Sequence, residues 1–115
     1  MLDKISKLTL KDSSLLRDAC FIGGEWVAAD GGGTIKVDNP ATGAIVGGVP
    51  NMGVVETKRA IEAANAALPA WRARTAKERS AILRKWFDLM MTNQEDLAMI
   101  MTAEQGKPLA ESRGE

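Results

Sequence analysis

The stretch that decides the fold is TAKERSAILRKWFDLMMTNQEDLAMIMTAEQG, residues 75–106. It opens with a capping box, in which the Thr75 side chain can accept from the amide of Glu78 while Glu78 reaches back. Apolar residues then recur at helical spacing over a wide face. Asn93 ends this helix or caps the next one, whose apolar stripe runs up to Gly106, a residue suited to a left-handed C-cap. The stretch therefore predicts two consecutive amphipathic helices.

Helical patterns also lie on either side of this stretch. Residues 54–68, VVETKRAIEAANAAL, are rich in alanine and carry apolar residues at helical spacing. We expect this helix to end at Leu68, because Pro69 disfavours the helical conformation in the residue before it. Pro108 is a good first residue of a further helix. Each of these helices has an apolar face that must be buried against something.

Residues 20–50 follow a different pattern, in which short apolar runs are separated by glycine pairs and an Asn-Pro step. This pattern is typical of short strands joined by tight turns, and residues 39–43, NPATG, are the clearest turn. The sequence DGGGT, residues 30–34, joins strand-like segments and has no Gly-Lys-Ser/Thr after it. A hairpin tip is therefore favoured there over a phosphate-binding loop.

The predicted fold is α/β, with short strands followed by three or four amphipathic helices. Residues 1–19 form an N-terminal arm, with a short helix capped near Asp12. Residues 20–50 form the strands and turns, and residues 51–115 form the helical part.

Composition excludes several classes of function. Fifteen basic and fifteen acidic residues cancel, so nothing favours nucleic acid as a partner. No apolar run approaches the length that spans a membrane, and the first residues do not resemble a signal peptide. A single cysteine excludes an internal disulfide and fits a cytoplasmic location. These features are typical of an ordinary globular chain.

Few residues are candidates for chemistry. Cys20 is the only thiol and the chain has no histidine to activate it, so a buried, inert thiol is favoured. The acidic residues are expected on solvated faces or as cap partners. Glu104 is the exception, because it lies in the last turn of a helix, where the dipole disfavours a carboxylate. A negative charge at this position favours a neighbouring cation, which could be Lys107, an arginine or a bound metal ion. The alternative is that Glu104 is a plain surface carboxylate. The tryptophans and methionines are expected in a core or an interface.

Several motifs, in order and at these distances, resemble the N-terminal part of the aldehyde dehydrogenase family. They are FIGGEWV, VDNPATGAIVGGVP, ALPAWRARTAKERSAILRKWFDLMM and EQGKPLAES. The resemblance runs from about residue 10 to residue 115 and is greatest to bacterial succinate-semialdehyde dehydrogenases. It implies that the chain is the outer part of a Rossmann-like cofactor-binding domain in an enzyme several times longer.

The resemblance also implies an activity for the whole enzyme. A cysteine thiolate attacks the aldehyde, hydride passes to NAD or NADP, and a glutamate activates the water that releases the acid. The substrate implied is succinate semialdehyde, oxidised to succinate, and the alternatives are a sibling substrate such as glutarate semialdehyde or a non-catalytic helical interaction module. The implied partners are the rest of the same polypeptide, the small aldehyde and further copies in a homo-oligomer.

No catalytic or cofactor-binding residue of the family pattern falls within this chain, so the 115 residues alone are expected to bind no cofactor and to be inactive. One site can be carried over. Some family members hold a monovalent cation between backbone carbonyls before the Asn-Pro step and an acidic residue before the Gly-Lys-Pro motif. Those positions correspond here to Val37, Asp38 and Glu104.

Overall fold

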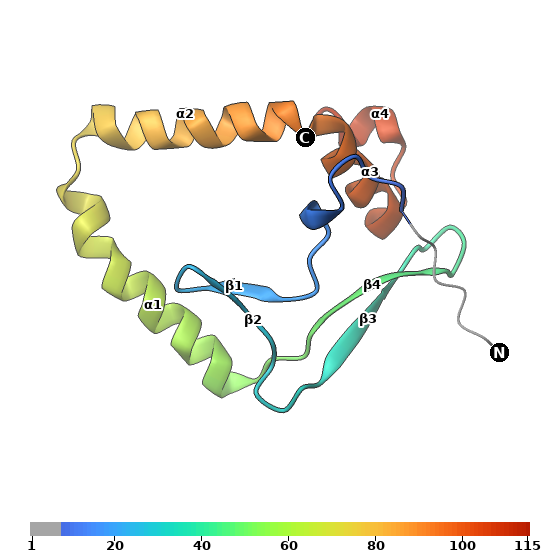
Figure 1. The fold of residues 1–115 in the computed structure, drawn as a ribbon, viewed down its shortest axis with the longest axis horizontal. Helices are drawn as coiled ribbons and strands as arrows, with labels where there is room; N and C mark the ends of the chain where they lie inside the picture. The colour runs from blue at the N-terminus through green and yellow to red at the C-terminus, as the bar shows by residue number, and fades with distance from the viewer. Residues whose placement is uncertain (1–7) are drawn as a thin grey trace.

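The computed structural model describes residues 8–115, and its elements follow the predicted order of strands and then helices (Figure 1). A short 3-10 turn, η1 (Ser13–Leu15), comes first. The strands are β1 (Cys20–Ile22), β2 (Glu25–Val27), β3 (Thr34–Asp38) and β4 (Ile45–Pro50). The helices are α1 (Val54–Ala73), α2 (Ala76–Thr92), α3 (Gln94–Gln105) and α4 (Leu109–Ser112). The α/β prediction is confirmed.

The strands form two separate antiparallel hairpins, β1–β2 and β3–β4. Gly23 and Gly24 have φ values of 61° and 88°, which only glycine adopts without strain, and they make the tight turn of the first hairpin. The prediction of a hairpin tip at residues 30–34 was wrong. Because β2 pairs with β1 and β3 pairs with β4, this glycine-rich segment connects two hairpins, and Gly32 closes a turn by donating its amide to the Ala29 carbonyl.

The first hairpin lies against α1, on the side rich in alanine. A Cβ added at Gly23 would stand 3.9 Å from the Cβ of Ala63, an ordinary van der Waals distance, so only about one methyl group separates the hairpin turn from the helix. Small side chains on the helix permit this approach. The alanine-rich pattern is therefore a packing surface for the hairpin.

Helix α1 is longer than the sequence predicted. It continues through Pro69 to Ala73, whereas we expected it to end at Leu68. Proline removes only one hydrogen bond from the ladder and clashes locally, a cost that the surrounding turns can offset. Thr75 then caps α2 and forms the predicted box: its hydroxyl accepts from the Glu78 amide at 3.2 Å, and Glu78 accepts from the Thr75 amide at 2.7 Å.

Helices α3 and α4 pack against each other at the C-terminal end of the chain. Gly106 has a φ of 81° and ends α3 as the predicted left-handed cap. After Pro108 the chain turns into α4, where the Ser112 hydroxyl lies 2.8 Å from that of Thr102 on α3. Ala98 and Ala103 are buried here, and Val46 and Ala29 are the buried apolar residues of the strand region.

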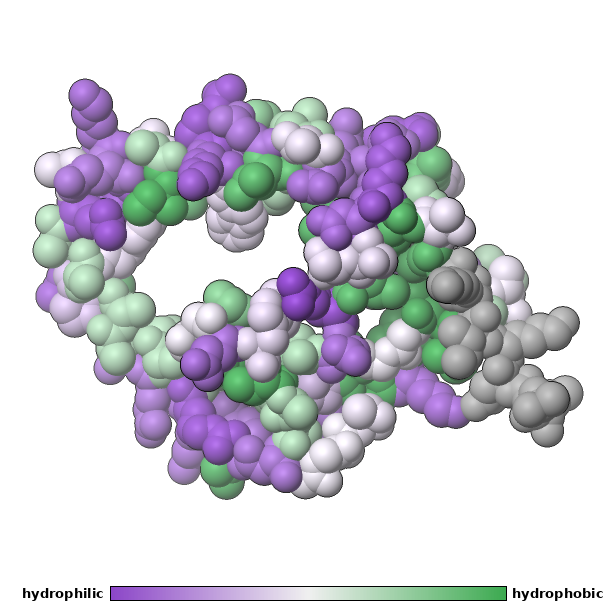
Figure 2. All heavy atoms as spheres, viewed as in Figure 1, coloured by the Kyte–Doolittle hydropathy of each residue, from purple (hydrophilic) through white to green (hydrophobic). Residues whose placement is uncertain are grey.

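Most of the apolar surface remains uncovered. No large side chain in the described part of the chain is fully buried, and the accessible surface is 8842 Å², against about 6,100 Å² for a folded monomer of this mass. The radius of gyration is 17.0 Å, whereas about 13 Å is typical of a compact chain of this length. Figure 2 shows an opening through the chain, bordered by α1, α2 and the strand region.

Candidate functional site

Two of the three predicted cation-site residues meet in one pocket. Val37 on β3 and Glu104 near the end of α3 both line a pocket of about 280 Å³. The other lining residues come from β4 and from the segment after η1: Leu16, Arg17, Asp18, Gly47, Gly48 and Val49. A strand and a helix end far apart in sequence therefore converge here.

The end of α3 lies close to the proline of the turn that follows β3. A Cβ added at Gly106 would lie 2.9 Å from the Cγ of Pro40. In that turn the Gly43 amide donates to the Asn39 carbonyl at 2.7 Å, and the Asn39 side chain accepts from the Ala41 amide at 2.9 Å. This close approach brings the end of α3, and with it Glu104, near the turn that follows β3.

Asp38, the third predicted residue, follows Val37 but does not line the pocket. The register between β3 and β4 shifts between these two residues, so that Val37 faces Gly47 and Asp38 faces Ile45. Such a bulge disrupts the hydrogen-bond ladder locally and re-aims the backbone. Carbonyl oxygens and a carboxylate are the oxygen ligands that hard cations prefer.

The compensating cation for Glu104 is not Lys107, because the Lys107 ammonium pairs with the Glu115 carboxylate. Arg17 lies in the same pocket, and its guanidinium carbon stands 4.6 Å from the centre of the Trp26 ring. Among the described residues Glu104 itself has no ion pair. Glu104 is exposed, which fits both a cation site and the alternative of a plain surface carboxylate.

No catalytic constellation is visible in residues 8–115. Cys20 is a free, half-buried cysteine on β1, opposite Val27, whereas a buried one was expected. No group of three or more histidine, cysteine, aspartate or glutamate residues in this range could hold a metal ion. Within the same range no helix is long and apolar enough to cross a membrane.

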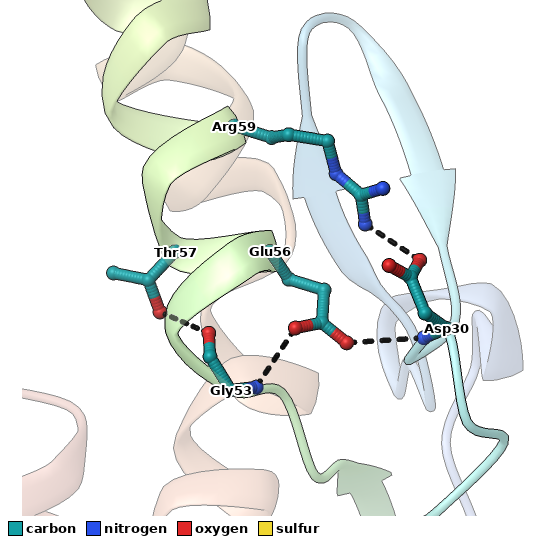
Figure 3. A network of polar contacts seen from close by, with 5 residues as sticks. All are labelled: Asp30, Gly53, Glu56, Thr57 and Arg59. Carbon is teal, nitrogen blue, oxygen red and sulfur yellow. Dashed lines mark hydrogen bonds and ion pairs between the residues drawn. The ribbon is translucent and has the colours of Figure 1, made fainter.

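The structure buries a carboxylate that the sequence placed among solvated faces and cap partners. Glu56 is 7% exposed, and it accepts from the amide of Gly53 at 3.0 Å and from that of Asp30 at 3.1 Å (Figure 3). Arg59 reaches Asp30 at 2.6 Å in the same network. Backbone donors, those of Glu56, Asp30 and Gly53, hold the pKa of Glu56 below its usual value. The helix-start position of Glu56 could have identified the cap but not the contact with the distant loop.

Asp96 is a second buried carboxylate, 5% exposed, near the start of α3. It accepts from the amides of Lys11 and Asp12 at 3.0 and 2.8 Å, and so ties the N-terminal segment to the helix. Both carboxylates have structural roles, since each joins segments distant in sequence.

The tryptophans are not core residues of this chain. Trp26 is 48% exposed and Trp86 is 62% exposed, and only Trp71 is half-buried. Of the two expected environments, a core within the chain is therefore excluded for the two exposed residues, and an interface remains.

The sequence was compared with known protein families and with individual proteins. The aldehyde dehydrogenase family model matches residues 26–115. The chain is 66% identical over 108 residues to glutarate-semialdehyde dehydrogenase of Pseudomonas putida and 60% identical over 108 residues to the NADP(+) succinate-semialdehyde dehydrogenase of Escherichia coli. Both alignments cover 94% of this chain and 22% of the relative.

The fold matches solved structures equally well. An aldehyde dehydrogenase from Brucella melitensis biovar abortus superposes with a TM-score of 0.91 at 56% identity, covering 94% of this chain and 22% of that one. This chain thus spans about a fifth of the length of the relatives it matches.

Proposed function

Because the chain belongs to the aldehyde dehydrogenase family, we propose that it works as the N-terminal part of an NAD(P)-dependent enzyme that oxidises succinate semialdehyde to succinate. The observation that carries the proposed activity is 60–66% identity over 108 residues to relatives named as semialdehyde dehydrogenases, of which the 60% identical one is named for succinate semialdehyde. The open apolar faces of α1 and α2 support it, since they need cover from further polypeptide. Family membership favours the enzyme over a non-catalytic interaction module.

The role of these residues in such an enzyme is to brace the cofactor-binding domain. The nicotinamide cofactor supplies the hydride acceptor. The residues described here contribute two hairpins, the helical frame, and the buried carboxylates of Glu56 and Asp96, which join segments distant in sequence. A homo-oligomeric state and a cytoplasmic location stay predictions.

Glutarate semialdehyde is the second candidate substrate, favoured by the higher identity of 66% to an enzyme named for it. The two substrates differ by one methylene group, which a binding pocket discriminates by about 10- to 200-fold. In the family that this chain resembles, the segments that contact the substrate lie outside the part matched by these residues. Identity within the scaffold is therefore weak evidence for one chain length over the other.

The test uses the complete product of the gene that encodes these residues. We expect it to oxidise both semialdehydes, with kcat/KM about tenfold or more higher for succinate semialdehyde, in assays with NAD⁺ and with NADP⁺. A preference for glutarate semialdehyde would select the second candidate. A gene product that reduces neither cofactor with either substrate would contradict both.

We further propose that the carbonyl oxygens of Val37 and Asp38 and the carboxylate of Glu104 hold a monovalent cation. The shared pocket of Val37 and Glu104, the bulge at Asp38 and the lack of an ion pair at Glu104 within the described residues support this site. Its role is to neutralise a carboxylate at the end of α3, where the helix dipole is unfavourable to it.

A further inference from the structure

Basic side chains are concentrated where α1 gives way to α2. Residues 71–85, WRARTAKERSAILRK, contain six basic residues and one acidic residue, although the whole chain has no net charge. The basic residues are Arg72, Arg74, Lys77, Arg79, Arg84 and Lys85. This corner lies at one end of the open frame, away from α3 and α4 (Figure 1). Its positive potential is therefore local and not a property of the whole molecule.

The acidic groups nearby are already engaged. Glu78 is held in the capping box with Thr75, and that hydrogen bonding, with a smaller effect of the Arg74 charge, keeps the pKa of Glu78 below its usual value. Asp88 pairs with Arg84 at 3.2 Å. Among the described residues, none of the other basic side chains of the corner forms an ion pair.

Arg79 is the basic residue of this corner that lacks a hydrogen-bond acceptor for a buried atom. Its Nε atom is buried and has no hydrogen-bond partner among the described residues. A buried donor without an acceptor is destabilising, and more so when the group is charged. Arginine satisfies this need best with a carboxylate, which accepts two parallel hydrogen bonds from the guanidinium.

Arg79 lines an open pocket of about 500 Å³. Two apolar side chains, Trp71 and Leu83, form part of its wall, and Ser80 and Arg84 add polar groups. An apolar wall beside the unpaired guanidinium of Arg79 fits an acidic side chain on a segment that also carries apolar residues.

We propose that this pocket receives a carboxylate-bearing segment from the part of a full-length dehydrogenase that follows these residues. The relatives are long enough to supply it, since the chain spans 22% of their length. The segment covers Trp71 and Leu83 and pairs with Arg79. This inference rests on the proposed function, because it requires the rest of the enzyme to be present.

The test uses a chimera in which residues 8–115 replace the matching segment of the E. coli relative, a substitution between sequences 60% identical. Arg79→Gln removes the charge that pairs, and Lys77→Gln removes an equal charge from an exposed position outside the pocket on the same helix. We expect Arg79→Gln to lower Tm by about 2–4 °C or more, and Lys77→Gln to leave it unchanged. Equal Tm values in the two variants would overturn the inference.

A second measurement identifies the segment even if the Arg79 variant does not fold. A photo-crosslinking residue is placed at Ser80, which lines the pocket without being the pairing group. We expect a product of monomer mass, joined to a peptide from beyond the replaced segment that contains aspartate or glutamate. A product of dimer mass, a peptide without an acid or no product at all would overturn the proposal.

The two proposals fail in different ways. A chimera without dehydrogenase activity that cannot be isolated as a folded protein would count against the proposed function. An active chimera in which Arg79→Gln matches its control, and in which position 80 crosslinks to no acidic segment, would refute the docking pocket alone.

Discussion

The contact between Gly106 and Pro40 should make Gly106→Ala far more damaging than an ordinary glycine substitution. The new Cβ would lie 2.9 Å from the Cγ of Pro40, closer than real Cβ contacts come. The proline ring is rigid, so the strain cannot be relieved by rotating a side chain. The backbone at Gly106, with a φ of 81°, also resists any residue with a Cβ.

The magnitude has two parts. A non-glycine residue in the left-handed region costs about 1–2 kcal/mol, and forcing an extra methyl group into a filled space costs about 1–3 kcal/mol. We therefore expect Gly106→Ala to lower the free energy of unfolding of the chimera by roughly 2–5 kcal/mol. Gly43→Ala is the matched control, since its φ is 70° and no atom lies within 4 Å of the added Cβ. It should cost only the first part.

The assay is urea denaturation of the chimera, followed by tryptophan fluorescence, as a double-mutant cycle. Pro40→Ala combined with Gly106→Ala should recover about 1–3 kcal/mol. Equal losses for Gly106→Ala and Gly43→Ala, or no coupling to Pro40→Ala, would show that α3 and the turn after β3 do not touch as described.

Four further outcomes are expected. The 115-residue chain alone should show helical circular dichroism yet bind hydrophobic dyes or self-associate, because Trp86, Leu83 and similar side chains are exposed; a dye-free monomer with a sharp thermal transition would contradict this. The same chain should reduce neither NAD⁺ nor NADP⁺ with succinate semialdehyde, and turnover abolished by Cys20→Ser would disprove that. In the chimera, Glu104→Gln should remove the stabilisation that K⁺ or Na⁺ gives in melting experiments, so an unchanged salt response would exclude the cation site. Because folding lowers the pKa of Glu56, the stability that this carboxylate contributes is complete above its ordinary pKa of 4.5 and is lost as pH falls through the lower folded value. Glu56→Gln should therefore flatten the dependence of unfolding free energy on pH in that acid range. Parallel pH profiles for parent and variant would argue against the buried hydrogen bonds of Glu56.

Local sequence signals predicted local structure well. The Gly23-Gly24 turn, the Thr75 capping box and the Gly106 cap depend on one or two neighbouring residues each, and all three are confirmed. In each case the residue type alone supplies the required φ angle or the hydrogen-bond acceptor.

The errors occurred where distant residues decide the outcome. Whether residues 30–34 form a hairpin tip depends on which strands pair, and propensity does not contain that information. The burial of Glu56 depends on a loop that precedes it by 26 positions. At Pro69 a single unfavourable residue was outweighed by the helix around it. For the candidate site, the association of Val37 with Glu104 was predicted from the resemblance to the family. The sequence pattern alone indicated only that Glu104 is a carboxylate in an unfavourable position, the last turn of a helix.

The uncovered faces of α1 and α2 have a consequence for biosynthesis. An N-terminal segment leaves the ribosome first, and translation proceeds at about 5–20 residues per second. In a polypeptide as long as the relatives, these helices would wait for tens of seconds before the segments that cover them were made. Throughout that time they would present side chains such as Trp86, at 62% exposure, to the cell. Such a nascent chain is a natural substrate for chaperones that bind extended apolar surface. The yield of folded protein should therefore depend on chaperones more strongly than the stability of the finished protein does.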